Sequence, residues 1–190
     1  MKQSLLALFV AVVILLPACG RMSAPAEDSV TGQSTVEELG LPATVDLEFV
    51  AGEQVQAVPA TLHAGRGYSV YIPDSGWKKE TEREGMALAD AWESTLDDEV
   101  EFAVYHYGNT PLQEAVTNFL EEEEDYVFHE LLLNEEATEP LEGVDEDGDF
   151  LRFLIRVGKE GTYLVTWKYR DAYGSAASQA EQMARSFVAV

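Results

Sequence analysis

Two alternating stretches joined by a glycine-bounded turn limit this chain to folds built on an antiparallel sheet. Residues 150–157 and 162–169 each carry apolar or aromatic side chains at every second position, and they are separated by Gly158-Lys159-Glu160-Gly161. A period of two is typical of strands, and a short glycine-containing linker between two such runs predicts a hairpin. The side chains that share a face are Leu151, Phe153, Ile155 and Val157 in the first stretch and Tyr163, Val165, Trp167 and Tyr169 in the second.

Further strand-like stretches precede this hairpin. We expect strands over residues 44–51, 54–63, 67–73, 78–83, 86–93, 100–107 and 126–133. The sixth is the clearest, with Val100, Phe102 and Val104 predicted on one face and Glu101, Ala103 and Tyr105 on the other. Residues 134–143 are interpreted as an acidic connection.

Two stretches have a helical period instead. Leu112, Ala115, Val116, Phe119 and Leu120 recur at helical spacing, and Thr110 followed by Pro111 predicts a capped start. The acidic run at 121–125 opposes the helix dipole, so this end is expected to fray. A second helix is predicted over residues 176–189, with its apolar stripe formed by Ala176, Ala180, Met183, Ala184 and Phe187. Strands with one helix between them and one at the end predict an α+β fold, a central antiparallel β-sheet with helices packed on it.

The first 20 residues predict export and lipid attachment. One lysine, an apolar run over 5–16 and small residues before Cys19 form a signal peptide over residues 1–18, too short to span a bilayer. Leu16-Pro17-Ala18-Cys19 resembles the lipobox of bacterial lipoproteins, which implies a diacylglyceryl group on the Cys19 sulfur and a place on the extracytoplasmic face of a bacterial cell membrane. The alternative is a secreted protein cut after Ala18 that carries one free thiol. Cys19 is the only cysteine, so no disulfide within the chain uses it.

Composition divides the rest of the chain and restricts its partners. Residues 19–43 are rich in Ser, Ala, Gly, Glu and Pro and predict a flexible tether, and residues 44–190 are predicted to form a single globular domain. The chain has 12 Lys and Arg against 35 Asp and Glu, a formal net charge of −23. Such a charge repels phosphate-rich surfaces, so a nucleic-acid partner is excluded.

The candidate chemical groups do not form a recognisable catalytic or metal site. The acidic run at 145–149 fails the calcium-loop pattern because Phe150 and Arg156 occupy the positions of the required Gly and Glu. It is interpreted as a turn in which Asp147 and Gly148 take positive φ angles, while weak calcium binding there or at 121–125 stays open. The three histidines, His63, His106 and His129, lie on or beside different predicted strands and receive no ligand role. No nucleophile motif is present, so catalytic, cofactor-binding and metal residues are predicted to be none.

Aromatic residues offer another kind of site. Tyrosine and tryptophan are frequent in strands and also dominate binding hot spots, so an exposed cluster on one sheet face would mark a partner surface. The candidates are Tyr68, Tyr71, Trp77, Trp92, Tyr105, Tyr107, Tyr163, Trp167 and Tyr169.

One family resemblance adds to these inferences. Gly67-Tyr68-Ser69-Val70-Tyr71-Ile72-Pro73 with Trp77, and the final Met183-Ala184-Arg185-Ser186-Phe187, make residues 63–190 resemble the PsbP-like group, which includes the Ran-binding Mog-type proteins and many small bacterial lipoproteins. The resemblance implies an α/β/α sandwich and a role in binding or assembly, with no shared catalytic residues.

Three functions are therefore carried forward. The first is a lipid-anchored, non-enzymatic binding or assembly module whose partner is an envelope protein, a peptide or a basic surface. The second is a structural protein that responds to calcium, and the third is an extracytoplasmic hydrolase, which would need a concave pocket with a polarised Ser, His or carboxylate set.

Overall fold

The computed structural model describes residues 39–81, 87–128, 139–172 and 174–190. The leader predicted over residues 1–18 lies outside these ranges, as do Cys19, His129 and all but the last five residues of the predicted tether. None of the helices within the four ranges is long and apolar enough to cross a membrane.

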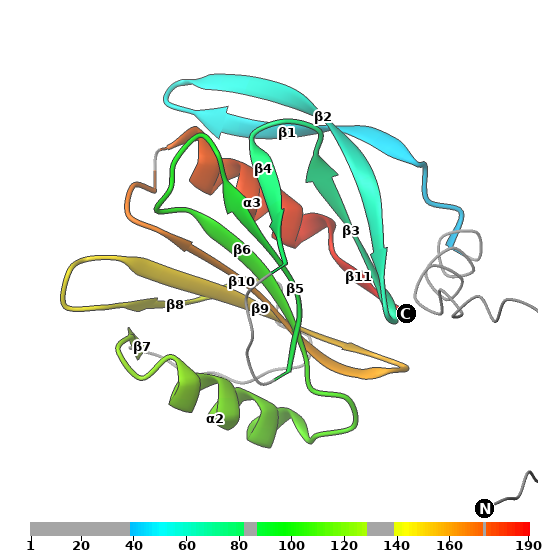
Figure 1. Ribbon diagram of the computed structural model, residues 1–190, viewed down its shortest axis with the longest axis vertical. Coiled ribbons are helices and arrows are strands. Elements are labelled where there is room, and N and C mark those ends of the chain that lie inside the picture. The colour runs from blue at the N-terminus through cyan, green and yellow to red at the C-terminus, as the bar shows by residue number, and fades with distance from the viewer. Residues whose placement is uncertain (1–38, 82–86, 129–138, 173) are drawn as a thin grey trace, which may run out of the picture.

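The strands form two antiparallel sheets (Figure 1). The smaller sheet has the order β1-β2-β3-β11, with β1 at Thr44–Ala51, β2 at Gln54–Gly65, β3 at Tyr68–Pro73 and β11 at Val188–Ala189. The larger sheet has the order β4-β5-β6-β10-β9-β8-β7. Its strands are β4 (Trp77–Glu80), β5 (Leu88–Ser94), β6 (Glu101–His106), β7 (Val127–Phe128), β8 (Leu141–Val144), β9 (Phe150–Gly158) and β10 (Gly161–Tyr169). Within the four described ranges, two whole helices complete the fold, α2 at Leu112–Glu122 and α3 at Ser175–Ser186.

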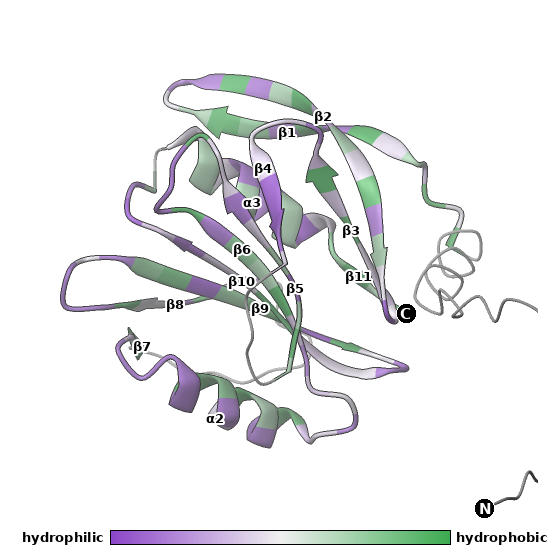
Figure 2. Cartoon of the chain, viewed as in Figure 1, coloured by the Kyte–Doolittle hydropathy of each residue, from purple (hydrophilic) through white to green (hydrophobic). Residues whose placement is uncertain are grey.

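The two helices cover opposite faces of the larger sheet (Figure 1). Helix α2 packs its buried Ala115, Val116 and Phe119 against one face and turns its charged side outward (Figure 2). Helix α3 contacts β10 of the larger sheet as well as β1 and β3 of the smaller sheet, so it lies between the two sheets. The predicted α+β class, an antiparallel sheet with helices packed on it, is confirmed.

Strand β6 shows how the larger sheet builds two cores at once. Val100, just before it, and its residues Phe102 and Val104 join the core that contains α3, whereas Ala103 and Tyr105 join the core that contains α2. The division into faces predicted from the sequence is therefore confirmed, but both faces are buried. An alternating strand with two buried faces is expected in a central strand covered on both sides.

The hairpin of β9 and β10 is also confirmed, with Gly158 paired to Gly161 across the turn. Gly161 has a φ of 129°, and a Cβ atom there would lie 1.8 Å from the carbonyl oxygen of Gly108. Only glycine fits this backbone conformation and this contact.

Three predictions at element ends are wrong. Part of the acidic connection predicted over 134–143 is a strand, β8, in which Glu142 pairs with Arg152 of β9. The final helix ends at Ser186 rather than Ala189, because Val188 and Ala189 pair with Ser69 and Tyr68 of β3.

The start of α2 is the third correction. Its N-cap is Pro111, with no hydrogen bond from a capping side chain. Thr110 belongs to the preceding turn instead, where its N–H donates to the carbonyl oxygen of Tyr107.

Candidate functional site

A hollow of about 880 Å³ opens between the two sheets. Its walls come from the end of β2, the strands β4 and β5, the end of β6 and the turn between β9 and β10. A second hollow, of about 490 Å³, shares Arg66, His106 and Glu160 with the first and continues over Gly108 and Lys159. We call the two together the groove.

A half-buried carboxylate, Asp90 of β5, organises the wall of the larger hollow. Its Oδ2 accepts a hydrogen bond from the Tyr68 hydroxyl and lies 3.0 Å from Nε2 of His63, while its Oδ1 forms an ion pair with Lys79. These partners come from β3, β2 and β4, so the cluster joins both sheets. The Asp90 side chain is only 13% exposed.

A bulge in β5 precedes this carboxylate. Leu88 and Asp90 of β5 oppose the adjacent residues Tyr105 and Val104 of β6, so Ala89 is the extra residue. A bulge bends its strand and changes the direction of nearby side chains. Ala89 itself is exposed and lines the hollow.

The contacts of Asp90 fix its charge. Burial raises the pKa of this carboxyl group, but the hydrogen bonds from His63, Lys79 and Tyr68 outweigh it and lower the pKa to about 2. Burial, followed by the charge of Asp90, raises the pKa of the Tyr68 hydroxyl far above its ordinary value. Asp90 is therefore an anion and Tyr68 a neutral donor throughout the neutral pH range.

The two described histidines are held by aromatic rings. His63 meets Trp92 edge-on with ring centres 5.0 Å apart, and His106 stacks on Tyr163 with centres 4.5 Å apart. His106 Nε2 also lies 2.9 Å from the carbonyl oxygen of Glu160. Both histidines line the larger hollow, although the sequence places them on separate strands.

The loop between β2 and β3 is tied to this site by glycine and tyrosine. A Cβ atom at Gly65 would lie 2.2 Å from the ring of Tyr68, so the absent side chain leaves space for that ring. Tyr163 donates its hydroxyl hydrogen to the carbonyl oxygen of Arg66, 3.0 Å away. These contacts position the backbone of Arg66 at the junction of the two hollows.

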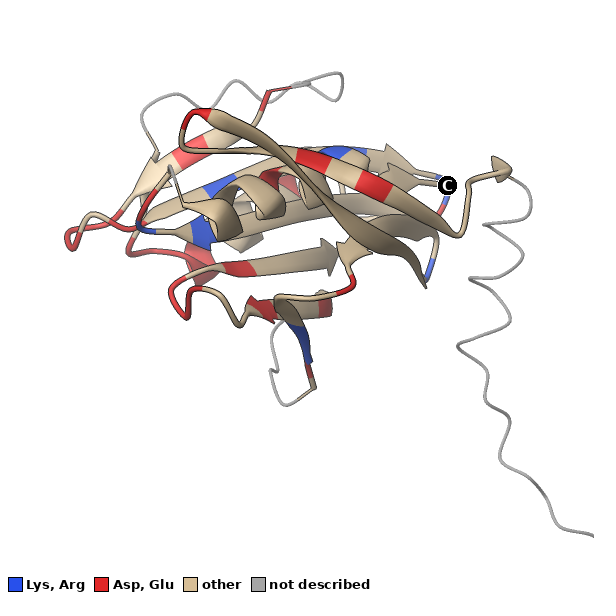
Figure 3. Cartoon of the chain, turned by 90° about the horizontal axis from the view of Figure 1, so that it is seen from above, with Lys and Arg blue, Asp and Glu red and all other residues tan. Residues whose placement is uncertain are grey.

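The charge balance of the groove is opposite to that of the whole chain. Acidic residues greatly outnumber basic ones along the chain, as Figure 3 shows for the described residues. The described lining of the groove, in contrast, has three basic residues, Arg66, Lys79 and Lys159, and two acidic ones, Asp90 and Glu160. The groove therefore lacks the acidic excess of the rest of the chain.

The acidic loop at 145–149 is organised by its own hydrogen bonds. Oδ1 of Asp145 accepts the N–H groups of Asp147 and Asp149, and Asp149 also pairs with Arg170. Gly148 has the predicted positive φ, 86°, but Asp147 does not. Within the described ranges, no three His, Cys, Asp or Glu side chains are grouped so that they could hold a metal ion.

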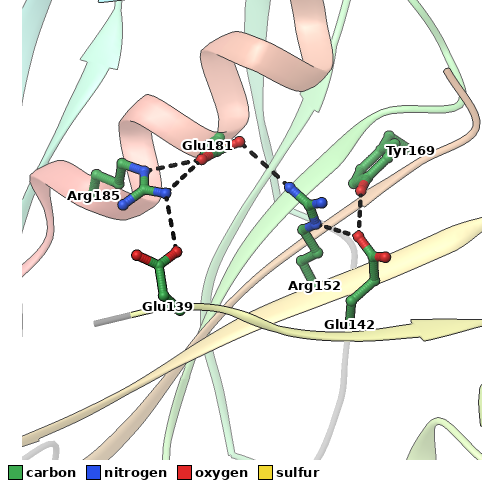
Figure 4. Close-up of polar contacts among 6 residues, drawn as sticks. All are labelled: Glu139, Glu142, Arg152, Tyr169, Glu181 and Arg185. Atoms are coloured by element: carbon green, nitrogen blue, oxygen red, sulfur yellow. Dashed lines mark hydrogen bonds and ion pairs between the residues drawn. The ribbon is translucent and has the colours of Figure 1, made fainter. Parts of the chain in front are cut away.

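A second polar network lies between α3 and the larger sheet (Figure 4). Arg152 of β9 pairs with Glu142 of β8 and with Glu181 of α3, and Glu181 also pairs with Arg185. The Tyr169 hydroxyl donates to the same Glu142 carboxylate at 3.0 Å. Each group has a partner of opposite charge or a hydrogen bond, so the network fastens the helix to the sheet.

The strand aromatics form no exposed cluster. Eight of the nine candidates are buried and Trp77 is half-buried, donating its indole N–H to Gln179 at 2.9 Å. They are core residues, and of the nine only Tyr107 lines the groove, whose other described lining residues are polar or aliphatic. Sequence reasoning therefore missed Asp90, Lys79 and Arg66.

Three comparisons with known proteins give a match only among solved structures. No family model matches the chain, and no curated protein matches it. Among solved structures, the solution structure of cyanobacterial PsbP (CyanoP) from Synechocystis sp. PCC 6803 is similar, with 12% identity and a TM-score of 0.45 over 65% of this chain and 87% of that chain. This structure is of the PsbP type that the sequence resembles, but the similarity is too low to carry any argument about function.

Proposed function

We propose that this protein is a lipid-anchored, extracytoplasmic binding module of a bacterium that holds a peptide segment of an envelope partner in the groove without reacting with it. The observation that carries the proposal is the groove itself. On one wall, Asp90 and His63 are already positioned by their contacts with each other and with Tyr68, which reduces the ordering cost of binding. Its two connected hollows favour an elongated ligand.

The chemistry of the lining favours binding over hydrolysis. A serine or cysteine hydrolase needs a nucleophile within hydrogen-bond reach of its base. Among the described residues that line the groove there is no serine, threonine or cysteine. His63 uses Nε2 to contact Asp90, and the nearby Tyr68 hydroxyl also contacts Asp90, so no activated nucleophile is assembled.

Calcium binding in the groove has no comparable support. Calcium takes six to eight oxygen ligands, usually from several carboxylates. The described lining offers two carboxylates, and one of them, Asp90, already contacts three side chains.

The anchor and the groove together give the proposal its setting. The signal peptide and Cys19 predict a chain tethered to the outer face of a membrane, which would keep the groove close to envelope proteins. Stable attachment needs more than one acyl chain, as the lipobox resemblance implies.

Filling the groove tests this function. Ala89→Trp places a large side chain at an exposed position inside the larger hollow, and Ala57→Trp makes the same change at an exposed position of β2 that does not line the groove. Each variant and the native chain are cross-linked in intact membranes, and the captured proteins are identified by mass spectrometry. We expect at least one partner that the native chain and Ala57→Trp capture and Ala89→Trp does not.

Two controls make the result decisive. Thermal unfolding must show that both variants fold, because only then does a lost partner report on the groove. The same set of captured proteins for all three chains would refute the proposed function.

A further inference from the structure

The charges of the groove are not all neutralised by pairs within it. Asp90 is neutralised within the wall by Lys79, and His63 and Tyr68 occupy its remaining oxygen. Arg66, Lys159 and Glu160 then remain at the junction and in the smaller hollow, two cations and one anion.

The guanidinium of Arg66 is only weakly engaged. Its Nε lies 4.0 Å from Oε2 of Glu160, at the outer limit of an ion pair, and the two side chains are 78% and 49% exposed. Ion pairs between exposed side chains contribute little, about 0 to 1 kcal/mol. As far as the described residues go, the fork of Arg66 is therefore available to a ligand.

Lys159, whose side chain is exposed, provides the second cation of this hollow. Its backbone N–H donates to the backbone oxygen of Val190 at 2.7 Å, which fixes the turn that carries it. Within the described part of the chain, the ammonium group of Lys159 forms no ion pair with a carboxylate. Arg66 and Lys159 line the same hollow, which has a volume of about 490 Å³.

From this arrangement we infer that the groove selects a peptide that presents a carboxylate to Arg66 and Lys159. The inference rests on the proposed function and names the chemistry of its ligand. An arginine fork matches the two oxygens of a carboxylate, and the nearby ammonium adds a second charge without a geometric requirement. Elsewhere the strongly negative chain repels such a peptide, so the charge balance also fixes where it docks.

The carboxylate has two sources in a peptide, an acidic side chain and the chain terminus. Three tripeptides separate them: acetyl-Ala-Glu-Ala-amide, acetyl-Ala-Gln-Ala-amide and acetyl-Ala-Gln-Ala with a free terminal carboxylate. Each is titrated into the full chain in detergent micelles, and backbone amide shifts are followed by NMR. Inorganic phosphate, titrated in the same way, tests for general anion binding.

We expect one or both carboxylate peptides to bind about tenfold more tightly than the neutral peptide, with shifts at Gly108 and Lys159. The combined change Arg66→Gln and Lys159→Gln should remove this preference. Lys78→Gln is the matched control, because Lys78 is exposed on β4 and does not line the groove. It should leave the affinity unchanged within about twofold. A tenfold preference corresponds to about 1.4 kcal/mol.

Other outcomes overturn the inference in distinguishable ways. Equal binding of all three peptides at the groove would reject the carboxylate and leave the proposed function standing. Tighter binding of phosphate than of either carboxylate peptide would also reject the carboxylate and leave the proposed function standing. If no peptide produces shifts, the carboxylate is rejected, and the cross-linking of Ala89→Trp decides separately whether the groove binds a partner.

Discussion

Replacing Asp90 with asparagine tests whether the charge of this carboxylate stabilises the wall of the groove. The change keeps the size of the side chain and removes its charge. Lys79, His63 and Tyr68 would then face a neutral amide. The nitrogen of this amide is a hydrogen-bond donor, and it would point towards groups that are donors themselves. The folded state should lose stability because these contacts favour the carboxylate over any neutral form.

The magnitude follows from the pKa of Asp90. The folded chain lowers this pKa from 3.8 to about 2. Each pKa unit is worth about 1.4 kcal/mol, so the charged form contributes about 2 kcal/mol to stability at pH 7. Because the folded pKa is the lower one, this contribution is present above pH 4 and is lost as the pH falls towards 2. About 1 kcal/mol remains at pH 3.

Urea unfolding of the native chain and of Asp90→Asn, measured at pH 7 and pH 3, checks this reasoning. We expect Asp90→Asn to lower the free energy of unfolding by about 2 kcal/mol at pH 7 and by half as much at pH 3. In thermal unfolding at pH 7, the same loss corresponds to a fall in Tm of about 4–8 °C. Asp46→Asn is the control, since Asp46 is exposed on β1, and it should change stability by less than about 0.5 kcal/mol. A difference between Asp90→Asn and the native chain that is the same at both pH values would refute the electrostatic explanation.

Two further predictions concern the hairpin and the anchor. Gly161→Ala should destabilise the fold by about 3 kcal/mol or more in urea unfolding, because its Cβ meets the backbone of Gly108, whereas Gly148→Ala, with nothing within 4 Å, should cost about 1 kcal/mol for its φ alone. A smaller loss at Gly161 than at Gly148 would contradict the packing argument. Cys19→Ser should move the chain from the detergent phase to the aqueous phase in a Triton X-114 partition, and an intact mass of the native chain without acyl groups would reject the anchor.

The sequence predicts a strand well where the residues of that strand alone show the alternating pattern. Alternating side chains and flanking glycines locate β1, β9 and β10 to within a residue or two. Strand β8 is missed because Glu142 and Gly143 have no strand preference of their own. Its position depends on β9, where Arg152 pairs with Glu142, and on Phe128, whose ring fills the space that a side chain at Gly143 would occupy.

The end of α3 is missed for a similar reason. Phe187, Val188 and Val190 continue an apolar pattern, so the sequence predicts a longer helix. In the structure the hydroxyl of Ser186 donates to the carbonyl oxygen of Met183 and accepts the N–H of Tyr71. Phe187 is already extended, with a ψ of 131°, which lets the chain pair with β3.

The groove depends on contacts that cross both sheets. His63 and Asp90 are 27 positions apart and lie on strands of different sheets, so their meeting depends on how the two sheets pack. One signal was present in the sequence: Asp90 is in phase with Trp92, which is buried, so an alternating strand directs this carboxylate inward. A buried acid in a strand needs partners, and that requirement could have drawn attention to it.

The two buried faces of the larger sheet also predict how the chain tolerates mutation. In β1, exposed positions alternate with half-buried or buried ones, so a complete substitution library should accept polar residues at every second position. In β10, Thr162 to Trp167 are all buried, so the same library should show depletion of charged residues at each consecutive position. Amino-acid substitutions should therefore accumulate slowly in the central strands of the larger sheet and faster in strands β1 and β2.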